Sequence, residues 1–430
     1  MTKLFSAHRL PSTVTAIRSD VSVLYFSPPG LSVCRGIVTA GERVRAAPMT
    51  VGPSSQRGKL RMTIEDTERI ARLLKPVSLS PLPHRPFVSV LIAHYNYEDY
   101  IGQAIESVLG QSYRDFELVI CDDGSTDSSP SIIESYAKRD SRIHFVRQAN
   151  AGVGSSTNTA YSLSKGEIIC FLDADDRYLP DKLQAVVEAF RSHPESGLLV
   201  HRVFLMDKTG SRTGLAPLTK LLPSGWYGPF VLRNGGLPAA GGPPTSSGRC
   251  LRREICELIF PVPVELTRYA DAVIAEQAGL RTSVVSLSQP LAEYRIHGSN
   301  LAATSGVTLE YVDRELRIQK ENWAINRKYL EKMDPVLARA FAPFERYPMS
   351  LMLTYIGARL GQEKNHSETY HRFVDGEGFA AMSKVSQWFW RLSILLPRWL
   401  FVTALGFVWG ANPLKQWVAR FSRNTRHASA

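Results

Sequence analysis

The feature that most constrains the fold of this chain is a regular alternation, between residues 87 and 207, of short apolar runs with segments of helical periodicity. Five apolar runs are typical of buried strands: FVSVLIAHYN (87–96), FELVICDDG (116–124), RIHFVRQ (142–148), EIICFLDAD (167–175) and SGLLVHRVFLMD (196–207). Apolar residues recur at helical spacing in the segments between them: 98–111, 131–139, 155–165 and 180–193. This alternation predicts an α/β domain with a Rossmann-like, mostly parallel sheet and helices on both of its faces.

Polar clusters follow three of these runs, at the point where each strand should end. They are His94-Tyr95-Asn96, Asp122-Asp123-Gly124 and Asp173-Ala174-Asp175-Asp176. In open parallel sheets, ligands bind beyond the carboxyl ends of the strands. We therefore expect the three clusters to share one edge of the sheet and to form a binding site there.

The acidic cluster in FLDADDRYLPD (171–181) suits a divalent metal ion. Carboxylates this close repel each other and raise one another's pKa, so they need a positive counter-charge. Mg²⁺ and Mn²⁺ accept oxygen ligands, and Mg²⁺ commonly takes one or two carboxylates together with phosphate oxygens. A metal held by this cluster would bridge to a diphosphate. The alternative is structural: Asp175 and Asp176 would favour the dipole of a helix that begins near Pro180.

The second cluster, in DDGSTDSS (122–129), offers another carboxylate at the same edge. Asp123 can accept a hydrogen bond from a nucleotide base or from ribose hydroxyls. A turn with an N-cap at Asp127 and Ser128 accounts for part of this segment. The glycine loop QANAGVGSSTN (148–158) lacks the Gly-Lys-Ser/Thr ending of a P-loop, so it gives only a weak phosphate signal.

In their order along the chain, these stretches resemble the family 2 glycosyltransferases, which have the GT-A fold. The matching segments are VSVLIAHYNYEDYIGQAIESVLGQSYRDFELVICDDGSTDSS, NAGVGSSTN, GEIICFLDADDRYLPDKL and EYRIHGSN, within about 87–300. The resemblance implies an inverting transferase that uses a nucleotide-diphospho-sugar and Mg²⁺ or Mn²⁺. The chain has Ala93-His94 where many members have Pro-Thr, and Thr157-Asn158 where many have Arg-Asn. The second departure removes an Arg that often helps to hold the base, so the resemblance does not identify the nucleotide.

Matching positions assign roles to individual residues. The resemblance implies that Asp123 contacts the base, that Asp173 contacts the ribose or the metal, and that Asp175 binds the metal on the diphosphate. Tyr95 and Asn96, which follow the first strand, are expected on the same donor-binding edge.

Two further roles fall near the end of the matching region. His297, in YRIHGSN, is a candidate contact of the diphosphate or metal, with a hydrogen-bonded structural role as the equal alternative. An inverting transfer also needs a general base for the acceptor, and the interval that holds it in the family contains Glu265, Asp271 and Glu276 here. We expect the base to be Asp271, because it directly precedes the apolar run AVIA and would lie at a helix N-terminus facing the cleft. Glu265 is the main rival, a simple N-cap is the alternative role for Asp271, and Glu276 is expected on the surface.

The rest of the chain divides by composition. We expect residues 1–61, rich in Ser, Arg and Pro, to be disordered or to precede the natural start. Residues 62–86 should form a short helix with Thr63 at its N-cap and then a Pro-rich linker, and 301–387 should be helical. Within the catalytic region, the loop GGPPTSSG (241–248) and the preceding Trp226 and Tyr227 either line the acceptor site or pack as a loop.

The segment 388–411 is very apolar but is broken by Arg391, Pro397 and Arg398. Its uninterrupted part is too short to span a bilayer, which needs about 20 apolar residues. We expect interfacial, amphipathic helices that, with the basic tail 412–430, contact an anionic membrane surface. The alternative is a helical hairpin packed on the catalytic domain.

The net charge and the cysteine content limit which classes of binding partner and which compartment are expected. A net charge of +11 and a pI of about 9.4 favour an anionic partner such as a nucleotide, a phosphate-bearing substrate or an anionic membrane. The excess cations lie largely in the two tails without a recognition motif, so nucleic acid is not expected. The five cysteines show no CxxC or metal spacing and are typical of buried thiols in a cytoplasmic protein. We expect the acceptor to be a glycan, a lipid-linked sugar or a protein. The alternatives to a glycosyltransferase are a non-catalytic scaffold at the membrane surface and a nucleotidyltransferase.

Overall fold

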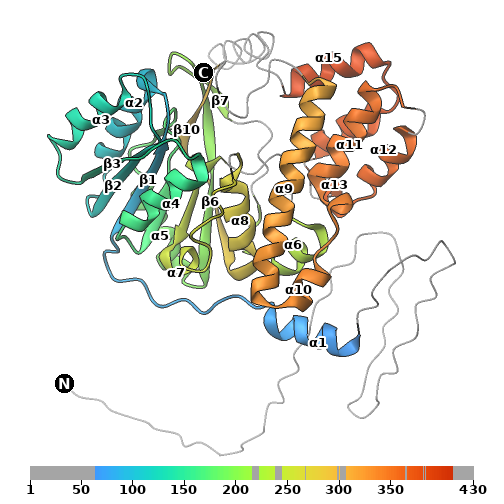
Figure 1. Ribbon diagram of the computed structural model, residues 1–430, viewed down its shortest axis with the longest axis horizontal. Coiled ribbons are helices and arrows are strands. Elements are labelled where there is room, and N and C mark those ends of the chain that lie inside the picture. The colour runs from blue at the N-terminus through green and yellow to red at the C-terminus, as the bar shows by residue number, and fades with distance from the viewer. Residues whose placement is uncertain are drawn as a thin grey trace, which may run out of the picture. The chain divides into compact units, whose positions relative to one another are not determined.

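The computed structural model describes residues 63–215, 222–237, 245–266, 268–297, 300, 307–363, 366–380, 382 and 384–409 (Figure 1). The expectations for 1–61, for the basic tail 412–430 and for much of the loop 241–248 therefore lie outside the described residues.

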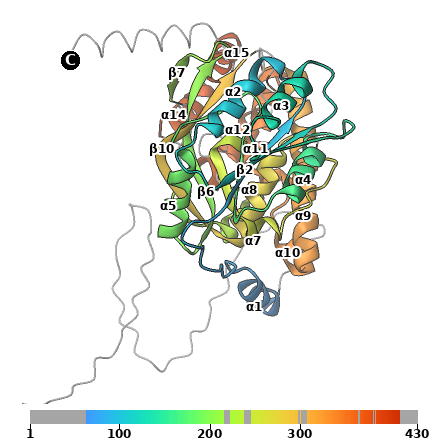
Figure 2. The same cartoon turned by 90° about the vertical axis from the view of Figure 1, so that its left-hand side faces the viewer.

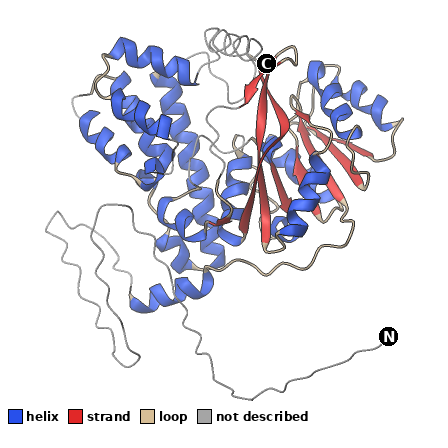
Figure 3. Ribbon diagram, turned by 180° about the vertical axis from the view of Figure 1, so that it is seen from behind, coloured by secondary structure: helices blue, strands red, loops and turns tan. Residues whose placement is uncertain are grey.

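The described strands form one sheet whose order is β3-β2-β1-β4-β9-β6-β10-β5, with β7 paired to β6 and β8 to β10. Their bounds are β1 Val88–His94, β2 Phe116–Asp122, β3 Ile143–Arg147, β4 Ile168–Phe171, β5 Arg177–Tyr178, β6 Ser196–Asp207, β7 Arg212–Leu215, β8 Gly225–Trp226, β9 Arg249–Arg252 and β10 Ser283–Ile296. Strands β3, β2, β1 and β4 run parallel, as do β6 and β10 (Figure 3). The mostly parallel sheet expected from the sequence is confirmed.

Helices cover both faces of this sheet because its strands are apolar on both sides. Alternate residues of β1 point to opposite faces: Val90 packs in one core and Leu91 in the other. The first core is closed by α2 (Glu98–Leu109), α3 (Ser129–Ala137) and α5 (Lys182–Ser192). The second is closed by α4 (Val153–Leu163), α7 (Arg253–Cys256) and α8 (Ala270–Arg281). The described cysteines, Cys121, Cys170, Cys250 and Cys256, are buried and unbridged.

One strand was not expected from the sequence. β9 inserts antiparallel between β4 and β6, where it pairs with both neighbours. It is only four residues long and begins at the end of the irregular Gly- and Pro-rich stretch 208–250, which carries no clear strand pattern. The 3₁₀ turn η1 (Ser246–Gly248) leads directly into it.

Before the sheet, the expected capped helix is present as α1 (Ile64–Leu73). The Thr63 side chain accepts from the Asp66 amide and Asp66 accepts from the Thr63 amide, which is a complete capping box. α1 lies beside α10 (Pro335–Ala340), and an ion pair between Arg69 and Asp334 joins the two (Figure 2).

After the sheet, the chain is helical, as expected. The long helix α9 (Leu309–Met333) packs against α8 and against α11 (Pro348–Leu360). The other helices after the sheet are α12 (His366–Val374), α13 (Glu377–Ala380), α14 (Lys384–Ser393), α15 (Arg398–Trp409) and the 3₁₀ turn η2 (Phe344–Arg346). The short helix α6 (Gly228–Asn234) comes earlier in the chain, between β8 and β9. A separate apolar core holds α9, α11, α12 and α13 together with α14 and α15.

The apolar segment 388–411 divides its side chains between this core and the surface. Trp390, Phe401 and Leu405 are buried in this core, so the segment packs on the helical region and not, as the hairpin alternative had it, on the catalytic domain. Trp388 and Trp399 remain 68% and 70% exposed. Among the described helices, none combines the length and apolarity needed to cross a membrane.

Candidate active site

The polar clusters that end β1, β2 and β4 lie at one edge of the sheet, as the sequence predicts. β1 pairs in parallel with both other strands, and His94 lies opposite Asp122 in the register. The Asp123 amide then donates to the His94 carbonyl at 2.8 Å, so the ends of β1 and β2 stay together. A cleft of about 360 Å³ opens beside them, lined by residues 96–100, Thr126, Asp127 and His297.

Tyr95 and Asn96 form the turn after β1. Asn96 adopts a left-handed backbone conformation with φ of 54°, which Asn tolerates better than most residues. Its Oδ1 accepts from the Thr126 amide at 2.8 Å, and its own amide donates to Ser125 Oγ at 2.9 Å. Asn96 thus joins the first two clusters, while the Tyr95 ring is 44% exposed beside the turn.

The Asp123 carboxylate is buried and already hydrogen-bonded within the protein. It accepts from Gln148 Nε2 at 2.7 Å and from the amides of Ala151 and Gly152 at 3.0 and 2.8 Å. Gly152 has φ of 89° at the N-cap of α4, a conformation that a side chain would strain. The carboxylate therefore shapes the loop 148–152 at the edge where the sequence places the base.

The acidic cluster after β4 is held by the end of β10. Asp175 is 7% exposed, and its Oδ2 lies 3.0 Å from His297 Nε2 and 3.1 Å from Asn300 Nδ2. The fully buried Asp176 accepts from Ser247 Oγ at 2.6 Å and from the Arg295 amide at 2.8 Å. Their printed hydrogen bonds go to Ser247 and to the end of β10 rather than to the first turn of α5, so the structure gives the helix-dipole alternative no direct support.

Repulsion between the carboxylates of this cluster affects the pKa of Asp173. Burial, then the nearby charges of Asp175 and Asp271, raises the pKa of Asp173 to about 7. Burial, then the charges of Asp175 and Asp173, also raises the pKa of Asp176 well above its ordinary value. Two carboxyl groups that resist ionisation side by side would be stabilised as anions by a nearby cation.

The residues present fit a metal ion that is completed by its substrate. Within the described ranges, no three His, Cys, Asp or Glu side chains are grouped so that they could hold a metal by themselves. A metal that binds a diphosphate needs only one or two carboxylates from the protein. Asp173 and Asp175 can supply those oxygens, and His297 lies directly behind Asp175.

Asp271 lies in the first turn of α8, close to this cluster. The N-cap of that helix is Tyr269, so the N-cap alternative for Asp271 is wrong. Its Oδ2 accepts from Arg249 Nη1 at 2.9 Å, and 29% of its side chain remains exposed. Asp271 contributes to the raised pKa of Asp173, so the two carboxylates are close enough for their charges to interact.

The other two acidic residues of this interval, Glu265 and Glu276, lie away from the acidic cluster. Glu265 is exposed in the loop before α8. Glu276, which was expected on the surface, is buried, with 7% exposure, because α8 is covered by α9 and the residues before α11. Its carboxylate accepts from Tyr347 Oη at 3.1 Å and also from Asn326 Nδ2. The expectation of a surface Glu276 is wrong.

Arg249 is the site residue that the sequence analysis missed. It begins β9, is 2% exposed, and its Nε and Nη2 have no hydrogen-bond partner among the described residues. It forms an ion pair with Asp271, and it also lowers the pKa of Asp173 and Glu276. No motif pointed to it, because its position depends on the unexpected strand.

Other residues considered from the sequence have structural contacts. Trp226 donates to the Leu280 carbonyl at 3.3 Å, and Tyr227 donates to the Pro223 carbonyl at 2.7 Å, as the loop-packing alternative requires. Asn158, at one departure from the family pattern, uses its amide group on the backbone of Val262.

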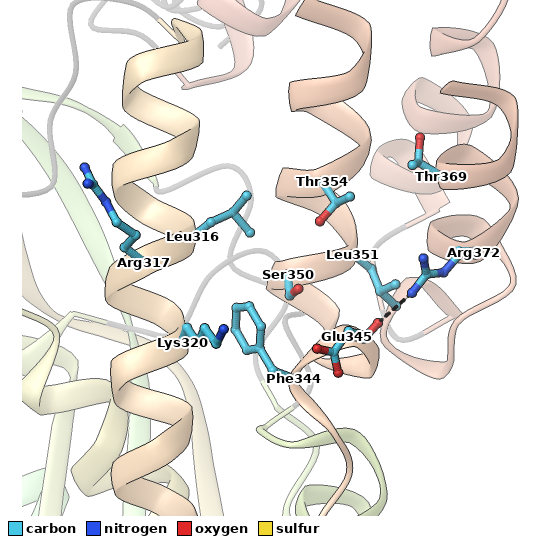
Figure 4. A pocket seen from close by; sticks show the side chains of 10 residues that line it. All are labelled: Leu316, Arg317, Lys320, Phe344, Glu345, Ser350, Leu351, Thr354, Thr369 and Arg372. Carbon is cyan, nitrogen blue, oxygen red and sulfur yellow. Dashed lines mark hydrogen bonds between the residues drawn. The ribbon is translucent and has the colours of Figure 1, made fainter. Parts of the chain in front are cut away.

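A second cleft, of about 340 Å³, lies in the helical region between α9, α11 and α12 (Figure 4). Lys320 points toward Phe344 at this cleft, and Arg372 donates to the Glu345 carbonyl at 3.4 Å (Figure 4). None of the residues expected from the sequence to be functional lines it.

Comparison with known proteins shows the family to which the chain belongs. A family model described as Glycosyl transferase family 2 matches residues 89–259. An uncharacterized glycosyltransferase of Nostoc sp. is 35% identical over 243 residues, which are 56% of this chain and 74% of that protein. The chondroitin synthase of Escherichia coli is 38% identical over 120 residues, 28% of this chain but only 18% of the synthase.

Among solved structures, the mannosyltransferase of Pyrobaculum calidifontis in complex with GDP-Man and Mn²⁺ overlaps with a TM-score of 0.44 at 17% identity, over 82% of this chain and 92% of that one. From the sequence matches, the chain belongs to the family 2 glycosyltransferases.

Proposed function

We propose that this glycosyltransferase moves a sugar from a nucleotide-diphospho-sugar to an acceptor hydroxyl with inversion, assisted by Mg²⁺ or Mn²⁺. The observation that supports this most is the charge interaction between Asp173, which follows β4, and Asp271, in the first turn of α8. One carboxylate suits the donor side and the other the acceptor side.

In this proposal the donor lies along the edge formed by the ends of β1, β2 and β4. Asp123 and the turn of Tyr95 and Asn96 contact the nucleoside, while Asp173 and Asp175 would hold the metal to which the diphosphate binds. When bound, the metal neutralises charge on the leaving diphosphate. His297 and Asn300 fix the orientation of the Asp175 carboxylate through their hydrogen bonds to Oδ2.

Asp271 acts as the general base on the acceptor side. Its carboxylate takes the proton of the acceptor hydroxyl as that oxygen attacks the anomeric carbon. The bond from the anomeric carbon to the diphosphate oxygen breaks on the opposite face, and the nucleoside diphosphate leaves with the bonding electrons. Arg249 keeps the Asp271 carboxylate oriented by donating to the oxygen Oδ2.

The acceptor class and location belong to the same proposal. The match to a chondroitin synthase supports a role in the synthesis of a cell-surface glycan or polysaccharide. The exposed rings of Trp388 and Trp399 support a peripheral contact with an anionic membrane.

A panel of nucleotide sugars tests the reaction, with Mg²⁺, with Mn²⁺ and with chelator. Release of nucleoside diphosphate should require the metal, and the anomeric configuration of the product, read by NMR, should be inverted. Asp175→Asn should weaken metal-dependent donor binding, while Asp271→Asn should leave donor binding intact and lower turnover by about 10² to 10⁴ fold. The exposed Glu265→Gln variant is the matched control. Intact turnover in Asp271→Asn with loss in Glu265→Gln would transfer the base role to Glu265.

A further inference from the structure

The start of α8 has a strained backbone. Tyr269, its N-cap, has φ of 57° and ψ of 30°, in the left-handed region that aromatic residues rarely adopt. Its carbonyl nevertheless accepts from the amides of Ala272 and Val273 and so opens the helix. Asp271 lies two residues further on, within the same turn. Such a conformation persists only where the surrounding structure enforces it, and it is often found where a functional group must be aimed.

A contact from the helical region holds Tyr269 in place. Its hydroxyl donates to Glu315 Oε2 on α9 at 2.9 Å. Burial and the Glu315 charge raise the pKa of Tyr269 far above its ordinary value, so the hydroxyl remains a donor. Glu315 is 3% exposed, and its charge is balanced by Arg268 and Arg314 at 3.6 and 3.7 Å. A buried, charge-balanced carboxylate is a rigid anchor for a hydroxyl.

Two contacts bear on the orientation of Asp271. Arg249 on β9 binds the carboxylate itself, and Glu315 on α9 fixes the backbone turn that carries it. The first contact belongs to the sheet and the second to the helical region, which lies outside the part of the chain matched by the family model.

We propose that Tyr269 and Glu315 are positioning residues, through which the helical region aims Asp271 at the acceptor hydroxyl. This rests on the proposed role of Asp271 as general base. It gives α9 a part in the reaction beyond its packing: the transferase domain supplies the base, and the neighbouring helix sets its direction. Misplacing a catalytic group by about 1 Å can cost about 100-fold in rate, so loss of one hydroxyl far from the donor should be measurable.

The test uses the full chain with Tyr269→Phe, which removes one oxygen and keeps the ring. Turnover of the donor selected by the nucleotide-sugar panel should fall by about 10- to 100-fold, with KM for the donor unchanged. Affinity for UDP and for GDP, each measured calorimetrically with MnCl2, should also be unchanged. Glu315→Gln keeps an acceptor oxygen for the hydroxyl, so it should retain more activity than Tyr269→Phe. Lys320→Ala, on an exposed part of α9 at the second cleft, is the control and should have no effect (Figure 4).

A double-mutant comparison separates positioning from general damage. If Tyr269 acts through Asp271, adding Tyr269→Phe to Asp271→Asn should cause no further loss. An equal fold-loss in both backgrounds would overturn the proposal, and so would wild-type turnover in Tyr269→Phe while Asp271→Asn is inactive. Full activity of Asp271→Asn alone would instead refute the base assignment on which the proposal rests.

Amide hydrogen exchange gives a readout that needs no substrate. Tyr269→Phe should speed exchange in the first turn of α8, residues 270–273, and leave the rest of the helix protected. Unchanged exchange there would show that the hydroxyl does not fix the turn, and the proposal would fall.

Discussion

The buried carboxyl group of Glu276 should make the stability of this protein depend on pH. Burial is the main cause that raises its pKa from 4.5 to about 7, against hydrogen bonds from Tyr347 and Asn326 and the nearby Arg249, which lower it. The negative charge of Asp271 raises it further. The folded protein thus holds a proton on Glu276 over a range of pH in which the unfolded chain has released it.

The direction in which stability changes with pH follows from proton linkage. Because the folded-state pKa lies above the unfolded value, the free energy of unfolding falls as pH rises from about 4.5 to about 7 and then levels off. One unit of pKa difference is worth about 1.36 kcal/mol, so the interval from 4.5 to about 7 corresponds to about 3 kcal/mol. With only 7% of Glu276 exposed, solvent screening reduces this little.

The substitution Glu276→Gln isolates this effect, because the amide stays neutral at every pH. Urea unfolding of both proteins should give similar stabilities near about pH 5, and the wild type should become less stable than the variant by up to about 3 kcal/mol near about pH 8. Tyr347→Phe removes a hydrogen bond that favours the ionised carboxylate, so it should deepen the wild-type loss at high pH. Glu265→Gln, at an exposed position, controls for the removal of one carboxylate. Parallel pH profiles for wild type and Glu276→Gln would refute the argument.

Three further outcomes are expected. Arg249→Ala should lower turnover at least tenfold with donor affinity retained, because Asp271 loses its buried partner, whereas Arg249→Lys should keep part of the activity. Donor binding and turnover equal to those of the wild type in Arg249→Ala would remove Arg249 from the site. A chain that starts at Met62 should match the full chain in melting temperature and turnover, since residues 1–61 show no core-forming pattern; a drop in either would contradict this. The protein should sediment with anionic liposomes and lose that binding when Trp388 and Trp399 are replaced by Ala; failure of the full chain to pellet would exclude the membrane contact.

The donor-side edge could be predicted because it is built from local signals. Strand β1 and strand β2 each appear in the sequence as an apolar run, and parallel pairing brings their ends together whatever lies between them. The clusters at Asn96, Asp123 and Asp175 therefore meet where expected. What the sequence did not indicate is that the Asp123 and Asp175 carboxylates are already hydrogen-bonded within the protein, to the 148–152 loop and to His297.

The acceptor side could be predicted only in part, because it depends on contacts between segments far apart in the chain. Arg249 lies beside Asp271 only because β9 pairs antiparallel with β4 and β6, and four residues that directly follow a Gly- and Pro-rich loop carry too little pattern to indicate a strand. Tyr269 meets Glu315 only because α9 packs on α8, which no feature of either helix predicts by itself.

Glu276 shows most clearly why the burial of a side chain could not be predicted from the sequence of its own helix. In the sequence AVIAEQAG, the pair Glu276-Gln277 looks like the solvent face of an amphipathic helix, because polar residues follow apolar ones at helical spacing. That inference assumes that one face of the helix meets water. Helix α8 instead lies between the sheet and α9, and its polar face is matched by polar groups: Asn326 bonds both Glu276 and Gln277. Burial with such partners leaves the same sequence pattern as exposure, so only the neighbouring helix distinguishes a surface carboxylate from one whose pKa is raised to about 7.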